Sequence, residues 1–283
     1  MSLSNKALLV TLNVSQWTGR KLDRKATSSV ESSHSTQGNV GNYHKRLLPG
    51  ATELRKVSAS ASALREFFYT QTLPWLADGT RILSSANYID FTSAFRSYRS
   101  DYENSVKAFI DAYPALRIAA QSKLGELFND GEYPTEQSLA ERFACSISFM
   151  PLPDVSDFRI ELSDAERADF ESKMRETESR ALQDCWQRIY DVVNRATSKL
   201  SESKPIFHDS LLENMRDLCA LLPKLNVTDS PDLERMRSEL ESTVSKIGTA
   251  DALRASSATR SSALTQLKDI ESRMGAFMGA VQS

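Results

Sequence analysis

The sequence has little of what breaks helices and little of what carries catalysis or disulfide chemistry. Its 283 residues include ten Gly, nine Pro, three Cys and three His. So little glycine and proline favours helices and excludes a collagen-like or a Pro/Gly-rich disordered chain. The three cysteines are widely spaced and odd in number, so we expect buried, reduced thiols. A nucleophilic or disulfide-bonded cysteine is the alternative.

A long hydrophobic run is also missing. Crossing a bilayer takes about 18 to 20 consecutive apolar residues. The most apolar stretch near the start, residues 7–12, is too short even for the core of a signal peptide. These absences predict a cytoplasmic protein without membrane contact.

The common catalytic and cofactor motifs are absent as well. The chain contains no G-x-x-x-x-G-K-[ST], no G-x-G-x-x-G and no G-x-S-x-G. No cysteine or acid completes a metal-ligand pattern with His34, His44 or His208. The acids between Glu161 and Glu178 are interleaved with Lys and Arg, which favours a solvated helix face over a divalent-cation site. We therefore predict no catalytic residue, no metal and no cofactor, while an enzyme of unrecognised class stays open.

Charge is distributed unevenly along a chain whose formal net charge is -2. Residues 1–56 carry nine Lys or Arg against three Asp or Glu, a net charge of +6, which leaves -8 for the remainder. A basic head on an acidic body indicates an anionic partner for the head, or attraction between head and body within one fold or one oligomer.

Hydrophobic periodicity predicts a small antiparallel sheet. Residues 7–15 alternate with a period of two, and residues 79–84 read as a short strand. Residues 145–162 read as two strands around a Pro-rich connection. Because an isolated hairpin is marginal in water, we expect the strand at 7–15 to complete a sheet with this hairpin.

The rest of the chain has helical periodicity. A stripe begins at Thr52 and ends before Pro74, and an aromatic stripe follows from Phe91 to Tyr113. Aromatic rows at helical spacing are typical of a core, with base stacking as the alternative. Five helices are predicted after the first stripe: 88–128 with a kink at Pro114, 163–200 with a capping box of Ser163 and Glu166, and three between Phe207 and the C-terminus.

These elements predict a mainly α fold with a small antiparallel β-sheet (α+β), in which long antiparallel helices pack as an elongated bundle. Two long helices, 88–128 and 163–200, are expected to pack antiparallel beside the sheet. We expect an α+β core over residues 1–203 and a C-terminal helical region over 204–283. Residues 27–44 are too polar to offset chain entropy by burial, so a mobile loop is predicted there.

The helix predicted over 163–200 carries a helix-packing seam at heptad spacing. The seam runs for under three heptads, which is short for a free coiled coil. The sequence leaves open whether it faces its own chain or a neighbour. Its main positions are Leu182, Trp186, Ile189, Val193 and Leu200.

The sharpest candidate binding patch follows the first strand. An aromatic ring and a glycine stand beside several cations: Trp17, Gly19, Arg20, Lys21, Arg24 and Lys25. Such a cluster can clamp a phosphate or stack a base. In the structural alternative, Trp17 anchors the strand end, Gly19 turns the chain and Arg20 pairs with the acidic body.

The W-T-G-R-K at residues 17–21 resembles the W-[ST]-G-R-K motif of a domain-of-unknown-function family found in tailed phages and proteobacterial mobile elements. A second matching region covers residues 204–214 and continues through 221–226 to Pro231. Residues 22–26 depart from the pattern, since they read L-D-R-K-A where the family often reads L-x-P-E-D-L. The resemblance spans most of the chain.

The genes of that family are often found near a MoxR-type AAA+ ATPase and a von Willebrand factor A protein. The resemblance therefore implies a bacteriophage-type accessory subunit of an ATPase machine in a bacterial host cell, and it assigns no residue a role. We expect a non-enzymatic structural or adaptor protein that acts through protein–protein contacts or as a homo-oligomer. The alternative is a nucleic-acid-binding accessory protein that uses the basic N-terminal region.

Overall fold

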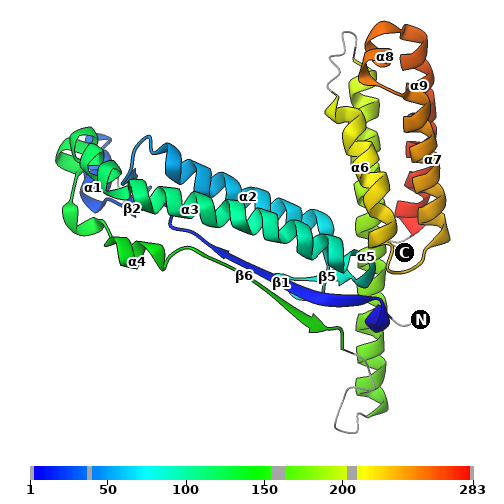
Figure 1. The fold of residues 1–283 in the computed structure, drawn as a ribbon, viewed down its shortest axis with the longest axis horizontal. Helices are drawn as coiled ribbons and strands as arrows, with labels where there is room; N and C mark the ends of the chain where they lie inside the picture. The colour runs from blue at the N-terminus through cyan, green and yellow to red at the C-terminus, as the bar shows by residue number, and fades with distance from the viewer. Residues whose placement is uncertain (1–2, 37–39, 154–162, 203–208, 281–283) are drawn as a thin grey trace. The chain divides into compact units, whose positions relative to one another are not determined.

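The computed structural model describes residues 3–36, 40–153, 163–202 and 209–280 (Figure 1). It is mainly helical with a small antiparallel sheet, which confirms the predicted fold class. Two compact units divide the chain. The bundle unit comprises Met1–Thr11, Tyr69–Phe91 and Ser148–Ser283, and the arm unit comprises Leu12–Phe68 and Thr92–Ile147.

Four helices of the bundle unit run alternately up and down, as in a four-helix bundle (Figure 1). Their core is largely aliphatic, and the side chains of Ile189, Leu222, Leu240 and Leu267 are fully buried in it. The four bundle helices are α5 Asp164–Leu200, α6 Ser210–Leu225, α7 Pro231–Ile247 and α9 Ser257–Ala280. The short helix α8 Ala250–Ala255 lies between α7 and α9 in the sequence.

The ends of two bundle helices follow the predicted signals. Ser163 and Glu166 form both hydrogen bonds of the capping box at the start of α5. The Ser230 side chain accepts a hydrogen bond from the Leu233 amide, with Pro231 in the first turn of α7, and Gly248 caps the other end.

The structure answers the question that the seam on α5 left open. Trp186, Ile189, Val193 and Leu200 are buried, and Leu182 packs against the same core. That core includes side chains of α6, α7 and α9, so the seam faces its own chain.

The sheet has the strand order β4-β5-β1-β6. β1 pairs antiparallel with β5, from Ala7 opposite Ser84 to Thr11 opposite Thr80. The predicted strand at residues 7–15 therefore lies between β5 and the first strand of the predicted hairpin, whose second strand falls outside the described residues. The strands are β1 Ala7–Ser15, β4 Leu73–Pro74, β5 Thr80–Ser84 and β6 Ala144–Pro151.

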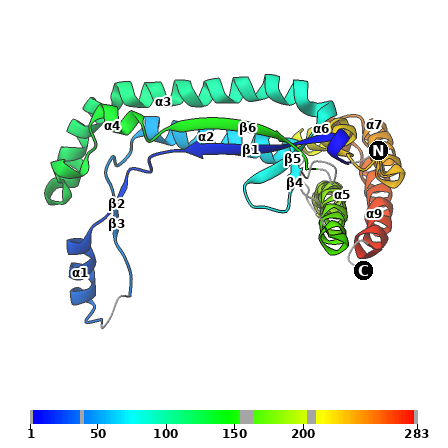
Figure 2. The same cartoon turned by 90° about the horizontal axis from the view of Figure 1, so that it is seen from below.

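The arm unit is built on α2 and α3, which lie side by side and antiparallel (Figures 1 and 2). Tyr102, Phe109 and Tyr113 of the aromatic stripe are almost fully buried, in one cluster with Val57 and Ala61 of α2. The stripe is therefore mostly core, with Tyr98, at 36% exposed, stacked on the ring of Phe67. The helices of this region are α2 Thr52–Gln71, α3 Tyr88–Leu124, which continues through Pro114, and α4 Glu136–Ala140.

The two long helices, α3 and α5, have different partners, which corrects the expectation that they pack on each other. Tyr102, Phe109 and Tyr113 of α3 pack in the core of the arm unit, whereas the aliphatic seam of α5 packs in the bundle unit. The predicted boundary near residue 203 would also separate α5 from the helices that cover its seam. The structure places all of them in one unit, because each needs the others to bury its apolar face.

A two-stranded ribbon and a helix extend away from the α2–α3 pair of the arm unit (Figure 2). We call this segment, residues 20–46, the arm. Residues 27–33 lie in its helix, which corrects the predicted mobile loop over 27–44. The helix forms because the Asp23 side chain accepts a hydrogen bond from the Ala26 amide, although no residue of the helix is buried. The arm consists of β2 Arg20–Leu22, α1 Arg24–Ser33 and β3 His44–Arg46.

Short 3₁₀ turns complete the described structure: η1 Leu3–Asn5, η2 Ser85–Asn87, η3 Gly125–Leu127 and η4 Asp130–Glu132. Over the described ranges, no helix has both the length and the apolar character needed to cross a membrane.

Candidate functional site

Trp17 forms the base of the arm. Its side chain is only 8% exposed, and its ring centroid lies 6.1 Å from that of Phe109 and 6.2 Å from that of Tyr113. These are ordinary distances for stacked and edge-on aromatic pairs. Trp17 therefore anchors the end of β1 in the core, as the structural alternative proposed, and its ring is not open to a base.

Gly19 turns the chain from this anchor into β2. Its φ of +63° lies in the left-handed region, and a Cβ there would lie 2.9 Å from Cδ2 of Leu54. Its carbonyl oxygen accepts a hydrogen bond of 2.7 Å from the Leu47 amide, just after β3. Trp17 and Gly19 thus fix where the cations that follow them stand.

The ribbon places like charges directly opposite each other. Arg20 of β2 pairs with Arg46 of β3, and Lys21 pairs with Lys45. Directly paired residues of antiparallel strands share a face and lie close together, so each pair is repulsive unless an anion stands nearby.

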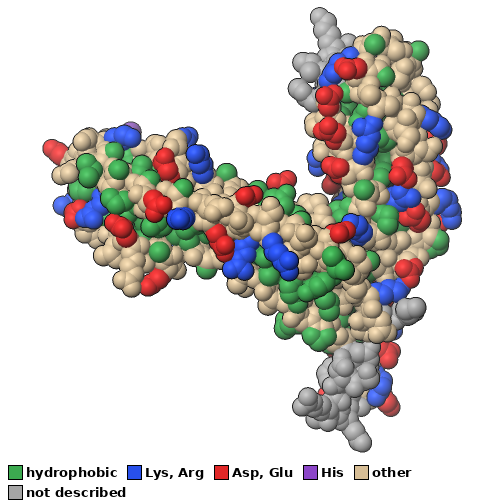
Figure 3. Space-filling view, in the orientation of Figure 1, with side chains coloured by type: hydrophobic (Ala, Val, Ile, Leu, Met, Phe, Trp, Pro, Cys, Tyr) green, Lys and Arg blue, Asp and Glu red, His purple; other side chains and the backbone are tan. Residues whose placement is uncertain are grey.

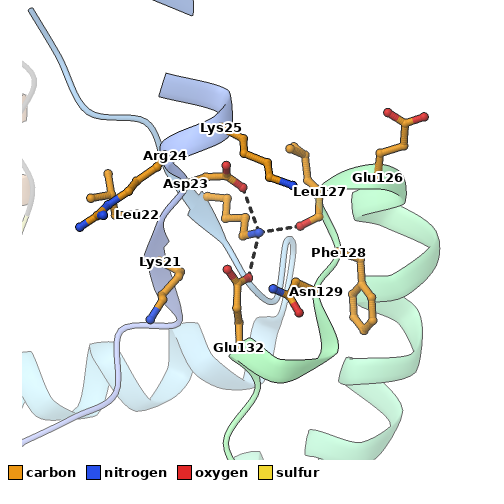
Figure 4. Close-up of a pocket in the computed structure, with 11 residues that line it drawn as sticks. Lys21, Leu22, Asp23, Arg24, Lys25, Glu126, Leu127, Phe128, Asn129 and Glu132 are labelled. Carbon is orange, nitrogen blue, oxygen red and sulfur yellow. Dashed lines mark hydrogen bonds and ion pairs between the residues drawn. The ribbon is translucent and has the colours of Figure 1, made fainter. Parts of the chain in front are cut away.

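On one face of the ribbon, two carboxylates neutralise Lys45. Its side chain is 4% exposed, and its Nζ lies 3.0 Å from Oδ2 of Asp23 and 2.8 Å from Oε2 of Glu132. Nζ also donates a hydrogen bond of 2.7 Å to the carbonyl oxygen of Leu127. Figure 4 draws these three interactions as dashed lines. They fix β3 to the turn after α3.

The pKa values of this buried cluster favour the charged forms. The Ala26 amide and then Lys45 hydrogen-bond to Asp23 and hold the pKa of its carboxyl below the ordinary value. Burial lowers the pKa of Lys45, but its hydrogen bonds to Glu132 and Asp23 outweigh burial and raise it. Lys45 therefore serves the structure of the arm.

The other arm cations have no such neutralisation. Arg20, Lys21, Arg24, Lys25 and Arg46 are all exposed. No acidic side chain among the described residues forms an ion pair with any of them. The expectation that Arg20 pairs with an acidic body therefore finds no support within the described residues.

Two open grooves lie beside these cations. The first, of about 700 Å³, is lined by Lys21, Arg24 and Lys25 and by the turn from Glu126 to Asn129 (Figure 4). The second, of about 690 Å³, is lined by Arg20, Lys21 and Arg142. Both grooves carry a net positive charge, because three acids face four cations in the first and Glu132 faces three cations in the second.

The remaining candidates for chemistry are placed as follows. His34 and His44 are exposed, and His208 lies outside the described residues. No three His, Cys, Asp or Glu side chains of the described chain are arranged to hold a metal ion. The cysteines are free, and burial raises the pKa of Cys185 to about 12 and that of Cys219 to about 11. Burial also raises the pKa of Cys145, so all three thiols are protonated at neutral pH.

The acids at the start of α5 form ion pairs one helical turn away, Lys173 with Asp169 and Arg180 with Glu176. This is the solvated helix face that the interleaved charges indicated.

Sequence reasoning missed three residues that shape the site. Lys45 and Arg46 were counted only as part of the basic head, and Arg142 was not considered. Arg20 and Arg46 pair across a connection of more than 20 residues, so their register could not be read from the sequence. Arg142 lies far from both in the sequence. The one local indication of this site in the sequence is the pair of cations Lys45 and Arg46 directly before the apolar residues Leu47 and Leu48.

Comparison of the chain with protein-family models finds no match, and searches of curated proteins and of solved structures find no significant similarity. The resemblance carried by residues 17–21 therefore stays a prediction.

Proposed function

We propose that this chain is a non-enzymatic structural or adaptor protein of phage type that acts through protein–protein contacts. Its partner is a MoxR-type AAA+ ATPase, as the resemblance implies, or a second copy of itself. The observation that carries the proposal is an exposed apolar surface in the bundle unit, where β6 ends and α3 begins.

Three large apolar side chains are exposed there. Ile89 is 78% exposed, Met150 is 50% exposed and Tyr88 is 38% exposed. The ring of Tyr88 packs at 5.4 Å on that of Phe149, which brings the start of α3 next to the end of β6. Figure 3 shows hydrophobic side chains gathered over this part of the molecule.

Grouped exposed apolar side chains mark interaction surfaces, whereas single ones are normal. Elsewhere in the bundle unit, exposed helix faces carry ion pairs, such as Arg237 with Glu234. Water is excluded from apolar side chains when a partner covers them, which favours association. This supports a protein partner rather than a small-molecule substrate.

The test uses two exposed isoleucines of the same helix. Ile89→Glu places a charge in the apolar surface, and Ile118→Glu places one at a site that is 71% exposed in the arm unit. Both side chains are largely exposed, so both variants should fold. Size exclusion with light scattering would measure the mass of each variant alone and with a MoxR-type ATPase from the same genome, with and without ATP.

The proposal predicts a defined oligomer or ATPase complex that Ile118→Glu leaves intact and Ile89→Glu weakens at least about tenfold, since a buried unpaired charge is costly. A chain that is monomeric, and that binds the ATPase in no nucleotide state, contradicts the proposal. So does an equal effect of the two substitutions.

A second candidate function is favoured by the unpaired cations of the arm. They support a nucleic-acid-binding accessory protein, because exposed Lys and Arg that no acid neutralises can contact phosphates. The burial of Trp17 argues against the part of this hypothesis in which its ring stacks a base.

A further inference from the structure

We infer that the arm binds the phosphate backbone of duplex nucleic acid. The binding residues are the exposed cations of the ribbon and of the start of α1: Arg20, Lys21, Arg24, Lys25 and Arg46. The inference rests on the second candidate function and names the form of nucleic acid and the surface that contacts it.

The register of the ribbon is the first support. Arg20 stands directly opposite Arg46, so two guanidinium groups share one exposed face of a two-stranded ribbon. Like charges in this position destabilise the free protein. A bound phosphate between or beside the two side chains turns that repulsion into attraction, and guanidinium groups can contact phosphate with two hydrogen bonds.

The distribution of acids is the second support. Asp23 and Glu132, the acids nearest the ribbon, are both occupied by Lys45 on its other face. The first groove is lined by four cations, Lys21, Arg24, Lys25 and Lys45, against the three acids Asp23, Glu126 and Glu132, a net charge of +1. The groove therefore has a net positive charge, and Lys21, Arg24 and Lys25 are labelled in Figure 4.

The lining of the grooves favours phosphates over an acidic protein. Protein interfaces are anchored by large apolar or aromatic side chains that enter pockets. In the first groove, the side chains that come from the arm are Leu22 and charged groups, and the second contributes Arg20, Lys21 and Arg142 around rings that are already buried. Such a surface fits hydrated, charge-dominated contacts, which are typical of phosphate binding.

The aromatic residues favour a duplex over a single strand. Proteins that bind single strands stack successive bases on exposed rings beside cations. Here Trp17 is 8% exposed and Tyr133 is 7% exposed, so neither ring can be reached. Tyr43, at 44% exposed, is the one described aromatic residue of the arm, and Phe128 in the first groove packs against the ring of Tyr133 at 5.0 Å. These two rings do not form a row on which successive bases stack.

The size of the ribbon also fits a duplex. Each of its strands has three residues, a length of about 10 Å. Duplex DNA carries one negative charge per about 1.7 Å of axis, so a ribbon of this length faces several phosphates. A two-stranded ribbon is also narrow enough for the major groove, which is about 12 Å wide.

The test is the affinity of the full chain for a duplex of about 30 base pairs, measured by fluorescence anisotropy between about 50 and 200 mM salt. One variant neutralises the arm: Arg20→Gln, Lys21→Gln, Arg24→Gln and Lys25→Gln. A control variant neutralises four exposed cations of the bundle unit: Arg175→Gln, Arg195→Gln, Lys246→Gln and Lys268→Gln.

We expect the wild type to bind the duplex with a steep salt dependence. The arm variant should bind at least about tenfold more weakly at low salt, with a slope of log affinity against log salt that is shallower by about 3.6, since each of the four lost phosphate contacts removes about 0.9. The bundle variant should bind like the wild type. The single variant Arg46→Gln should weaken binding in the same direction, and it keeps the test valid if the fourfold variant folds poorly.

Three results would overturn the inference. Equal affinities of the arm and bundle variants would show that charge alone, and not the arm, decides binding. Tighter binding of a single strand would show that bases are contacted. Equal competition by polyglutamate of matched charge would assign the surface to an acidic protein. Because Ile89→Glu should weaken protein assembly and leave duplex affinity unchanged, failure of this inference is distinct from failure of the adaptor function.

Discussion

The bundle unit and the arm use positive charge in opposite ways. In the bundle, Arg237 is 14% exposed and lies between Glu234 and Glu241, and Arg188 donates hydrogen bonds to Asp184 and to the carbonyl oxygens that end α2. Among the described cations of the arm, Lys45 is the one that acids neutralise in this way, and Arg20 faces Arg46. Arg188 and Arg237 thus stabilise the fold of the bundle unit, whereas Arg20 and Arg46 of the arm are available to a partner.

The largest expected effect comes from the anchor of the arm. Trp17→Ala removes a buried ring from the core of the arm unit and should lower the free energy of unfolding by about 3 to 5 kcal/mol. Ile189→Ala in the bundle unit should cost about 2 to 5 kcal/mol. Denaturant unfolding would measure both values. Hydrogen exchange should increase first around α2 and α3 in one variant and around α5 in the other, and the comparison fails if both variants loosen the same helices.

The Lys45 cluster should make the arm sensitive to pH. The folded pKa of Asp23 is lowered, so its contribution to stability is present above its unfolded value of about 3.9 and is lost as the pH falls through the folded value. The folded pKa of Lys45 is raised, so its contribution is present below about 10.4 and is lost as the pH rises through the folded value.

Lys45→Met leaves Asp23 and Glu132 without their cation and should lower the melting temperature at pH 7. The loss of stability on acidification should then be smaller, because Asp23 keeps only its bonds to backbone amides and its folded pKa moves toward the unfolded value. Melting curves from pH 3 to 10 would show this, with Lys21→Met, an exposed neighbour, as control. An identical pH profile for both variants would remove Lys45 from its structural role.

Alanine substitutions at Gly19 and Gly79 compare the cost of backbone strain with and without a steric clash. Gly19→Ala should cost about 1 to 2 kcal/mol, because an alanine is strained at a φ of +63° and its Cβ would meet Leu54 at 2.9 Å. Gly79 has a φ of +84° with open space around a Cβ, so Gly79→Ala in the bundle unit should carry the strain alone. Equal costs in urea unfolding would mean that Leu54 moves aside at no cost.

The smallest effects should differ in sign. Arg20→Gln removes a repulsion with Arg46 and should raise the free energy of unfolding by less than about 1 kcal/mol. Arg237→Gln breaks two ion pairs and should lower it by less than about 1 kcal/mol. Unfolding at low salt resolves such differences best, since salt screens both terms. A destabilising Arg20→Gln would mean that this cation supports the fold after all.

The fold was largely predictable where apolar residues recur along the sequence at one regular spacing. The stripe from Thr52, the capping box at Ser163 and the Ser230–Pro231 start gave helices close to the observed ones. The part of α1 within residues 27–33 was missed, because no residue of this helix is buried. Asp23 was a possible N-cap in the sequence, but the polar composition of residues 27–44 led to the prediction of a loop.

Partners over long distances were not predictable. The apolar residues of the α5 seam could pack on either α3 or α9, because both of those helices have an apolar face. The sequence therefore did not identify the partner of α5. In the site, Trp17, Gly19 and the cations at 20, 21, 24 and 25 were identified as a cluster, with the roles of anchor and binding residue left open. The structure divides those roles by burial, and it adds Lys45 and Glu132, which are 87 residues apart.

The most direct test of the difference between bundle and arm is hydrogen–deuterium exchange of the full chain with and without duplex DNA at low salt. We predict slower exchange in peptides that cover Arg20–Leu22 and His44–Arg46, with α5, α6 and α7 unchanged. Protection confined to the bundle helices, or no protection while the duplex is bound, would contradict the account.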